Sequence, residues 1–276
     1  SSSATTVEQV YDRAGVHMAE PENVQEGMVL VTSSWKWDDS DELVPGAKLV
    51  DRDGQTVHSW KPNRSELFPE NDPKGGDPET SEYHGAYLLP NGDVLLVLLY
   101  IGAVRLNACG EVVWQLDKRN HHSVERAENG AFWIPGTSSE RRTSTSAFPD
   151  GFPGIDKPVW LDQVLHVSEG GEVLGKINVL DVLYQNGLER HIVKSMKPYP
   201  GDVRGNSSDV KDDPVHLNDI EPLSSSRAGE YPLFEAGDLL ISLRHPSLVL
   251  VFDPDSKEVK WHASEPWIHQ HDPDFI

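Results

Sequence analysis

Hydrophobic and polar positions along the chain predict short β-strands grouped into a repeated unit. In the clearest unit, residues 93–99 are almost entirely apolar, and shorter apolar runs follow at 103–106 and 111–114. A strand that does not alternate between polar and apolar positions is expected where neighbouring sheets cover both of its faces. The unit therefore predicts a buried antiparallel sheet that is stacked between others.

The same unit recurs, and each copy opens with a histidine. His84 and His122 each reach a glycine eight positions later, His216 does so after an insertion at 224–235, and His271 opens a further copy. An earlier unit consists of β-type runs at residues 28–32, 47–51 and 56–60.

Four short antiparallel strands per unit, repeating every 40 to 90 residues, are typical of propeller blades. We therefore predict an all-β fold, a β-propeller of four-stranded blades, with an N-terminal extension at 1–26 and the propeller at 27–276. A β-sandwich with irregular hairpins is the alternative, and the recurring Gly and Trp positions favour the propeller.

Three local predictions accompany this fold. Asp53-Gly54 indicates a two-residue hairpin of type I′, in which both central residues have positive φ. Residues 7–14 and a turn near 182–188 are expected to be helical. Long polar loops at 61–82, 136–158 and 181–213 are expected to shape the mouth of any site.

The number of units predicts an incomplete ring. Four blades and the start of a fifth leave an unpaired sheet edge, which invites association. We therefore expect the chain to be part of a longer propeller, or another chain or segment to complete it.

Charge and composition exclude several classes of partner. The chain has 276 residues, with 24 basic and 45 acidic side chains and a formal charge of −21. Such a charge disfavours binding to nucleic acid or to an anionic membrane surface. No apolar run approaches the roughly 18 residues that a spanning helix needs. Cys109 is the single cysteine, so the chain forms no internal disulfide.

The four repeat histidines are the candidate chemistry. Equivalent positions in a repeat architecture lie on one face, so His84, His122, His216 and His271 should converge on the channel lined by the innermost strands. They could fill the channel, bind a transition metal, or perform nucleophilic and acid–base chemistry on an anion. Arg244 favours the last, because a guanidinium repels a cation and suits a tetrahedral oxyanion.

These motifs resemble a known family. The units around His122 and Gly130, and at 215–219, 240–244 and 270–272, are similar to those of bacterial arylsulfotransferase (aryl sulfate sulfotransferase) propellers. That family is six-bladed and typically periplasmic or secreted. The resemblance covers residues 83–276, and residues 28–60 fit a further blade.

The resemblance implies a site and a reaction. The residue matching His271 is transiently sulfurylated in the family, and those matching His122, His216, Asn218 and Arg244 surround the sulfuryl group. His84 is expected to contact substrate in the same channel. An aryl sulfate and a phenol are the implied partners, PAPS is not used, and we expect no cofactor and no metal.

The chain also departs from the family, which keeps two alternatives open. It is shorter than the family's enzymes, ends five residues after the proposed nucleophile, and lacks the later blades and a cysteine pair. A non-catalytic propeller that serves as a binding or structural module is one alternative. The other is an oxygenase with a four-histidine metal site, similar to the carotenoid oxygenases, which Arg244 and Asn218 fit poorly.

Overall fold

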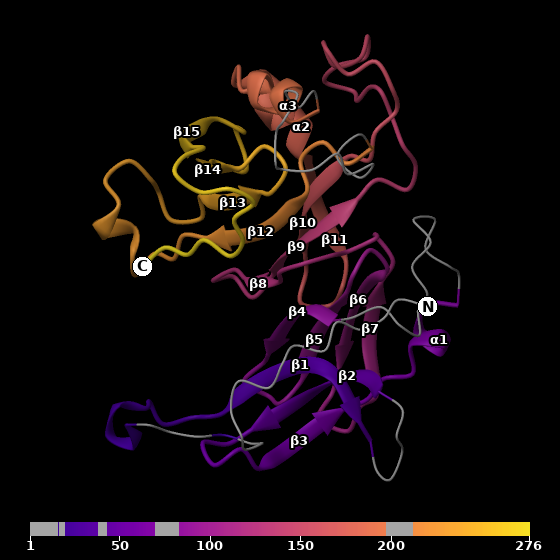
Figure 1. Ribbon diagram of the computed structural model, residues 1–276, viewed down its shortest axis with the longest axis vertical. Coiled ribbons are helices and arrows are strands. Elements are labelled where there is room, and N and C mark those ends of the chain that lie inside the picture. Colours follow the sequence, from indigo (N-terminus) through magenta and orange to yellow (C-terminus); the bar gives the residue numbers. More distant parts are fainter. Residues whose placement is uncertain (1–15, 17–19, 38–42, 70–82, 197–211) are drawn as a thin grey trace.

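The structure is a computed structural model that describes residue 16 and residues 20–37, 43–69, 83–196 and 212–276. Its strands form four antiparallel sheets, of which three have four strands and one has three (Figure 1). The predicted all-β fold class is confirmed at this level. The first unit differs from the predicted four-stranded blade, because three of its strands lie in the described part of the chain.

Each sheet is built from strands that are consecutive in the sequence. The first sheet contains β1 (Val29–Lys36), β2 (Leu43–Val50) and β3 (Thr56–Trp60); the second contains β4 (Tyr83–Leu88), β5 (Val94–Leu98), β6 (Gly102–Leu106) and β7 (Val112–Leu116). The third contains β8 (Glu125–Arg126), β9 (Phe132–Thr137), β10 (Asp162–Val167) and β11 (Val173–Asn178); the fourth contains β12 (Leu217–Pro222), β13 (Leu239–Leu243), β14 (Leu248–Phe252) and β15 (Val259–Ala263).

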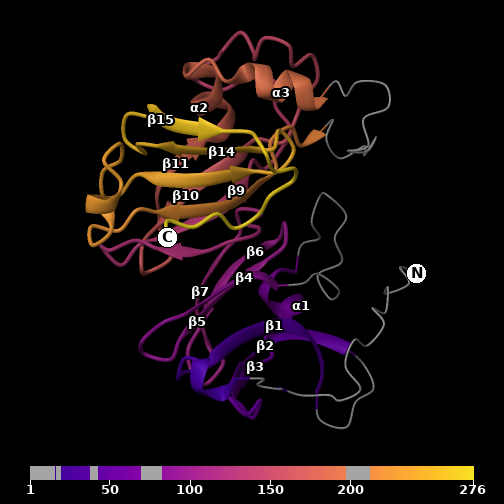
Figure 2. The ribbon, with the colours of Figure 1, turned by 60° about the vertical axis from the view of Figure 1, so that its left-hand side comes forward.

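The four sheets follow one another along an arc (Figures 1 and 2). β1 contacts β4, and β12 contacts both β8 and β9. The first strands of the first and second sheets, and those of the third and fourth sheets, are therefore neighbours, as they are along the inside of a propeller. The described residues do not close the ring, and its completion by a further segment or chain stays a prediction.

Apolar side chains hold the sheets together by packing between them. β5 and β14 are buried along their whole length, as the uninterrupted apolar runs predict. The contact between the second and third sheets includes Leu95, Trp114, Phe132 and Leu165. Each buried side chain of this size contributes about 1.5–3 kcal/mol, so sheet stacking supplies most of the stability.

Five of the hairpin turns share one hydrogen-bond pattern, and it is not the predicted one. The amide of Gly54 donates to the carbonyl of Asp51, and the amide of Asp51 donates to the carbonyl of Gln55, each at 3.0 Å. Gly54 has a φ of 79°, whereas Asp53 has no positive φ. The loop thus has three residues and ends in one left-handed glycine, so the type I′ prediction was wrong. The same bonds recur at Gly92, Gly110, Gly130 and Gly171, which explains the repeated glycine.

Helices are few in the described residues, and the two longest follow the third sheet. The elements are η1 (Pro21–Asn23), α1 (Arg64–Leu67), α2 (Val179–Gln185), α3 (Glu189–Met196) and η2 (Ala228–Glu230). The turn predicted near 182–188 is a pair of helices, because the buried side chains of α2 extend the apolar core. The helix predicted at 7–14 lies outside the described residues. None of the helices in the described ranges is long and apolar enough to cross a membrane.

Candidate functional site

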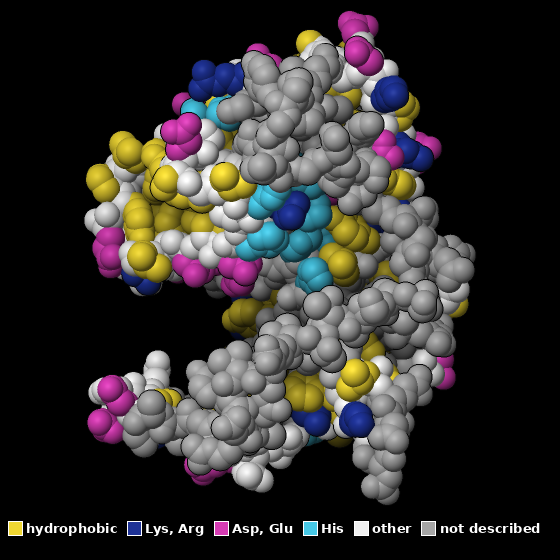
Figure 3. Space-filling model, viewed as in Figure 1, with side chains coloured by type: hydrophobic (Ala, Val, Ile, Leu, Met, Phe, Trp, Pro, Cys, Tyr) yellow, Lys and Arg dark blue, Asp and Glu magenta, His cyan; other side chains and the backbone are white. Residues whose placement is uncertain are grey.

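The four repeat histidines meet at one end of the sheets. The ring of His122 lies 5.2 Å from that of His84, 5.1 Å from His216 and 5.9 Å from His271, measured between centroids. Figure 3 shows histidine side chains gathered on one face, with a Lys or Arg side chain among them. His84 lies in β4, His122 and His216 precede β8 and β12, and His271 follows the last sheet. The predicted convergence of these side chains is therefore present.

Irregular backbone aims these side chains. His84 lies at a register shift between Tyr83 and Gly85, and Asn218 lies at the equivalent shift in β12. His122 and His216 have positive φ, 55° and 52°. Bulges re-aim side chains, and left-handed backbone at residues other than glycine is costly and concentrates at functional sites. The repeat therefore places the same distortion at the start of its inner strands.

Asp213 fixes the orientation of two imidazoles. Its Oδ2 accepts a hydrogen bond from His216 Nδ1 at 2.8 Å, and its backbone carbonyl accepts one from His245 Nδ1 at 2.5 Å. Its Oδ1 also accepts the backbone amide of His216 at 3.0 Å. A carbonyl or carboxylate oxygen accepts only, so both Nδ1 atoms carry protons and both Nε2 atoms are free to accept. Sequence reasoning missed Asp213 and His245, although Asp213 lies only three positions before His216.

Tyr100 and His121 complete the cluster and were also missed. The Tyr100 hydroxyl lies 3.2 Å from His216 Nδ1, and the Tyr100 ring lies 4.9 Å from that of His121. His121 Nδ1 is 2.9 Å from His122 Nδ1, and its Nε2 is 3.6 Å from Asp162 Oδ1. The His121-His122 pair was the available sequence signal for His121. Nothing in the sequence places Tyr100 here, because it lies in the turn between β5 and β6 and not at a repeat position of the histidines.

The segment that carries His271 is anchored by amide side chains. Asn218 Nδ2 donates to the Gln270 carbonyl at 2.7 Å, and Gln270 Nε2 donates to Ser242 Oγ at 3.0 Å. Asn218 is 1% exposed, so its amide positions the chain next to His271. His271 itself is exposed, and its Nδ1 lies 3.2 Å from the carbonyl of His269. That carbonyl requires a proton on Nδ1, which leaves Nε2 of His271 with a free lone pair.

A backbone hydrogen bond holds Arg244 next to the histidine cluster. Its amide donates to the carbonyl of His216 at 3.0 Å, and its charge contributes to the lowered pKa of His245. The side chain is half-buried, and its guanidinium has no hydrogen bond or ion pair with any residue that the structure describes. Its donors are therefore free for an anion.

Burial decides the charge of the central groups. Burial, reinforced by His121, His216, His84 and His271, holds the pKa of His122 well below its usual range. Burial also lowers the pKa of His245. Both imidazoles are uncharged at neutral pH, because desolvation disfavours the cation. Burial, followed by the charges of Asp213 and Asp162, raises the pKa of Tyr100, which keeps its hydroxyl protonated.

Carboxyl groups follow the histidines along the inner strands. Burial, then the charges of Glu221 and Asp219, raises the pKa of Glu125 to about 8. Burial is also the main cause that raises the pKa values of Asp219 and Glu221 to about 7. Asp272 and Asp274 contribute to these shifts. This inner-strand acid group is therefore partly protonated at neutral pH.

The four repeat histidines do not form a metal-binding set. Within the described ranges, the one group of three His or carboxylate side chains whose ligand atoms lie within 4.8 Å of one another is Asp213, His216 and His245. In that group both Nδ1 atoms already donate to Asp213. The geometry therefore does not support the four-histidine metal alternative.

Comparisons with known proteins identify the family. A family profile described as arylsulfotransferase (ASST) matches residues 85–276. A comparison with curated protein sequences gave no match. Among solved structures, a protein of unknown function from Bacteroides caccae is 12% identical with a TM-score of 0.38, over 80% of this chain and 56% of that one. A catalytically inactive virginiamycin B lyase from Staphylococcus aureus with quinupristin is 8% identical with a TM-score of 0.34, over 88% of this chain and 76% of that one.

The fold and the site define a propeller-like all-β protein with histidines at the start of successive sheets. The chain belongs to the arylsulfotransferase (ASST) family, whose profile covers most of its length. Membership supports a sulfotransferase-type function. The chain spans 56% of the length of the Bacteroides caccae structure that it matches.

Proposed function

We propose that the protein is a PAPS-independent aryl sulfate sulfotransferase that acts through a sulfohistidine. The observation that carries this proposal is the packing of His84, His216 and His271 around the uncharged ring of His122, beside a free guanidinium. Neutral imidazoles are nucleophiles, and a guanidinium binds sulfuryl oxygens with its planar set of donors. Family membership supports the same chemistry.

The transfer has two steps. Nε2 of His271 attacks the sulfur of an aryl sulfate, an S–N bond forms, and the S–O(aryl) bond breaks with its electron pair on the phenolate. A second phenol then gives its proton to the free Nε2 of His216 and attacks the same sulfur, the S–N electron pair returns to Nε2 of His271, and His216 releases the proton to solvent. Arg244 faces the charge on the sulfuryl oxygens, which a preorganised site stabilises, while the free Nε2 of His216 is the proton acceptor for the attacking phenol.

The family resemblance gives His122 the role of protonating the leaving phenolate or deprotonating the acceptor. Because burial keeps this imidazole uncharged, we propose instead that His122 hydrogen-bonds within the cluster, and that solvent and His216 carry the protons. The phenolate takes its proton from solvent, which reaches the exposed rings of His84 and His271. Asn218 acts by holding the His271 segment through the Gln270 carbonyl.

The test is capture of the covalent intermediate. The protein is mixed with 4-nitrophenyl sulfate, quenched in alkali to preserve the S–N bond, and digested for mass spectrometry. We expect a sulfuryl adduct on the peptide that contains His271, and release of 4-nitrophenol. His271→Asn should abolish both, whereas His262→Asn, which alters an exposed histidine of β15, should leave both intact. Full activity in His271→Asn would contradict the assignment.

The second candidate is a non-catalytic binding or structural module. The observation that favours it is the open arc of sheets, since a ring closed around the site holds its groups more rigidly. Folded protein that gives neither adduct nor phenol would support this candidate. A periplasmic or secreted location fits the proposed enzyme, and cell fractionation followed by immunoblotting tests it.

A further inference from the structure

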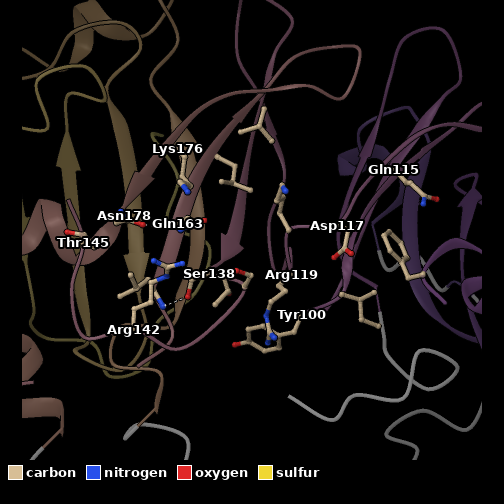
Figure 4. A pocket seen from close by; sticks show the side chains of 18 of the residues that line it. Tyr100, Gln115, Asp117, Arg119, Ser138, Arg142, Thr145, Gln163, Lys176 and Asn178 are labelled. Atoms are coloured by element: carbon tan, nitrogen blue, oxygen red, sulfur yellow. Dashed lines mark hydrogen bonds between the residues drawn. The ribbon is translucent and has the colours of Figure 1, made fainter. Parts of the chain in front are cut away.

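A cavity lies next to the histidine cluster. It has a volume of about 920 Å³ and lies between the second and third sheets (Figure 4). It is lined by the ends of β7, β9 and β11, the start of β10 and the turn before β6. The histidine cluster lies at the same end of the second sheet. His84 is at the start of β4, whose first residue, Tyr83, pairs with Leu98 at the end of β5. The turn that lines the cavity follows Leu98 directly.

Strand register builds the polar wall of the cavity. Gln163 is paired with Asn178, and Leu165 with Lys176, in the antiparallel contact of β10 and β11. Paired residues and alternate positions along a strand share one face of a sheet. All four side chains therefore line the cavity together. Gln163 is 7% exposed and donates from Nε2 to Asn178 Oδ1 at 3.0 Å, so this wall is rigid.

The cavity is positively charged in a strongly acidic protein. Its lining includes Lys118, Arg119, Arg142 and Lys176, against the single acid Asp117. Lys118 and Lys176 form no ion pair with any residue in the described ranges. Arg142 has an exposed partner, with its Nη2 2.8 Å from Glu140 Oε1. Basic side chains grouped within a chain of charge −21 mark a place for an anion.

Apolar side chains cover the end of the cavity near the cluster. Leu67 and Phe68, which lie in one predicted mouth loop, and Ile101 line it there. Tyr100 lines the same cavity, and its hydroxyl lies 3.2 Å from His216 Nδ1. Figure 4 shows Tyr100 and Arg119 between the two walls. One side chain thus borders both the cavity and the histidine cluster.

We infer that this cavity binds the part of the substrate beyond the reacting sulfate, and that this part is an aromatic group bearing a second anion such as a carboxylate. The inference rests on the proposed function. Phe68 and Tyr100 offer flat apolar contacts for the aromatic body, and Lys176 and Arg142 offer cations for its distal charge. Pockets of this kind combine an apolar wall with a few charges that set specificity.

Two matched fluorogenic sulfates test the inference. The value of kcat/KM for 4-methylumbelliferyl sulfate is compared with that for the analogue in which carboxymethyl replaces the methyl group. We expect the carboxylated sulfate to be preferred by about tenfold in the natural protein. Lys176→Gln should reduce that ratio about threefold, and Lys176→Gln with Arg142→Gln should remove most of it. Lys157→Gln, which alters an exposed lysine outside the cavity, should leave the ratio unchanged.

Isothermal titration with the same two sulfates separates the two proposals. Phenol release from neither sulfate, with no adduct on His271, would contradict the proposed function. The cavity would still be supported if the carboxylated sulfate bound more tightly and Lys176→Gln reduced the difference. Equal kcat/KM and equal affinity for the two sulfates, or a preference that both substitutions leave intact, would overturn the inference.

Discussion

Asp213 shows how one carboxylate organises the candidate site. It binds the Nδ1 protons of His216 and His245, one through its side chain and one through its backbone. It also lies 3.5 Å from the Tyr100 hydroxyl. An acceptor that fixes the tautomer of an imidazole keeps its other nitrogen ready to bind or react. Asp213 is therefore a positioning residue for His216.

Asp213→Asn tests this role. The amide can donate to Nδ1 and so favours the opposite tautomer of His216. We expect kcat for 4-nitrophenyl sulfate to fall by about 100-fold or more, with a changed pH profile and little change in folding. Asp212→Asn, which breaks an exposed ion pair with Arg141, is the matched control and should retain activity. A pH profile and kcat that do not change in Asp213→Asn would refute the positioning role.

The inner strands are the elements that carry the site, and they pack closely at its base. Gly85 follows the bulge at His84, and a side chain there would collide with the His122 carbonyl. The close approach of β4 to the segment before β8 therefore requires glycine. This contact brings two repeat histidines from different sheets together.

Gly85→Ala should separate these two elements. We expect a loss of about 1–3 kcal/mol in the free energy of unfolding, because the added methyl group overpacks the contact. Urea denaturation followed by tryptophan fluorescence measures it. Gly229→Ala is the control: a Cβ there meets nothing within 4 Å, so the change should stay within about 0.5 kcal/mol. Equal free energies of unfolding for Gly85→Ala and the natural protein would show that this contact relaxes without loss of stability.

At the scale of the whole molecule, negative charge accumulates along the inner strands. The pKa values of Glu125, Asp219 and Glu221 are raised to about 8, 7 and 7 in the folded protein, mainly by burial. Between their ordinary values near pH 4 and these raised values, the folded state binds more protons than the unfolded state. These three carboxyls therefore make stability fall as the pH rises through that window, and above about pH 6.5 the buried imidazoles of His122 and His245 no longer oppose the fall.

A pH series measures this linkage. We expect the urea midpoint to fall between pH 6.5 and pH 8.5, above the range in which the lowered pKa values of His122 and His245 act in the opposite direction, with a loss on the order of 1–3 kcal/mol. Glu125→Gln should flatten the dependence because it removes one carboxylate that must ionise. Glu172→Gln, at an exposed hairpin turn, should reproduce the natural slope. A urea midpoint that rises over this pH range would contradict the raised pKa values of these carboxyl groups.

The sequence by itself determined the repeat, and through it much of the fold and the position of the histidines. Apolar runs such as 93–99 predicted buried strands, because a covered sheet tolerates few polar side chains. The repeat also predicted that His84, His122, His216 and His271 would meet, since equivalent positions in stacked units lie together. The family match confirms the resemblance that the same motifs carried.

Only the tertiary structure decided which groups surround those histidines. Tyr100 and His121 come from different segments, and His245 is joined to His216 through Asp213, so the periodicity of the repeat does not reveal these partners. The three-residue turn at Gly54 and the helices α2 and α3 depend on local hydrogen bonds and buried packing that propensity does not fix. The cationic cavity likewise exists because Lys118 and Arg119 after β7, Arg142 in the loop after β9, and Lys176 in β11 line one space, although they are far apart in the sequence. Sequence spacing identifies the residues that occupy equivalent repeat positions. Contacts between sheets decide which other side chains surround them, and therefore their charge and hydrogen bonding.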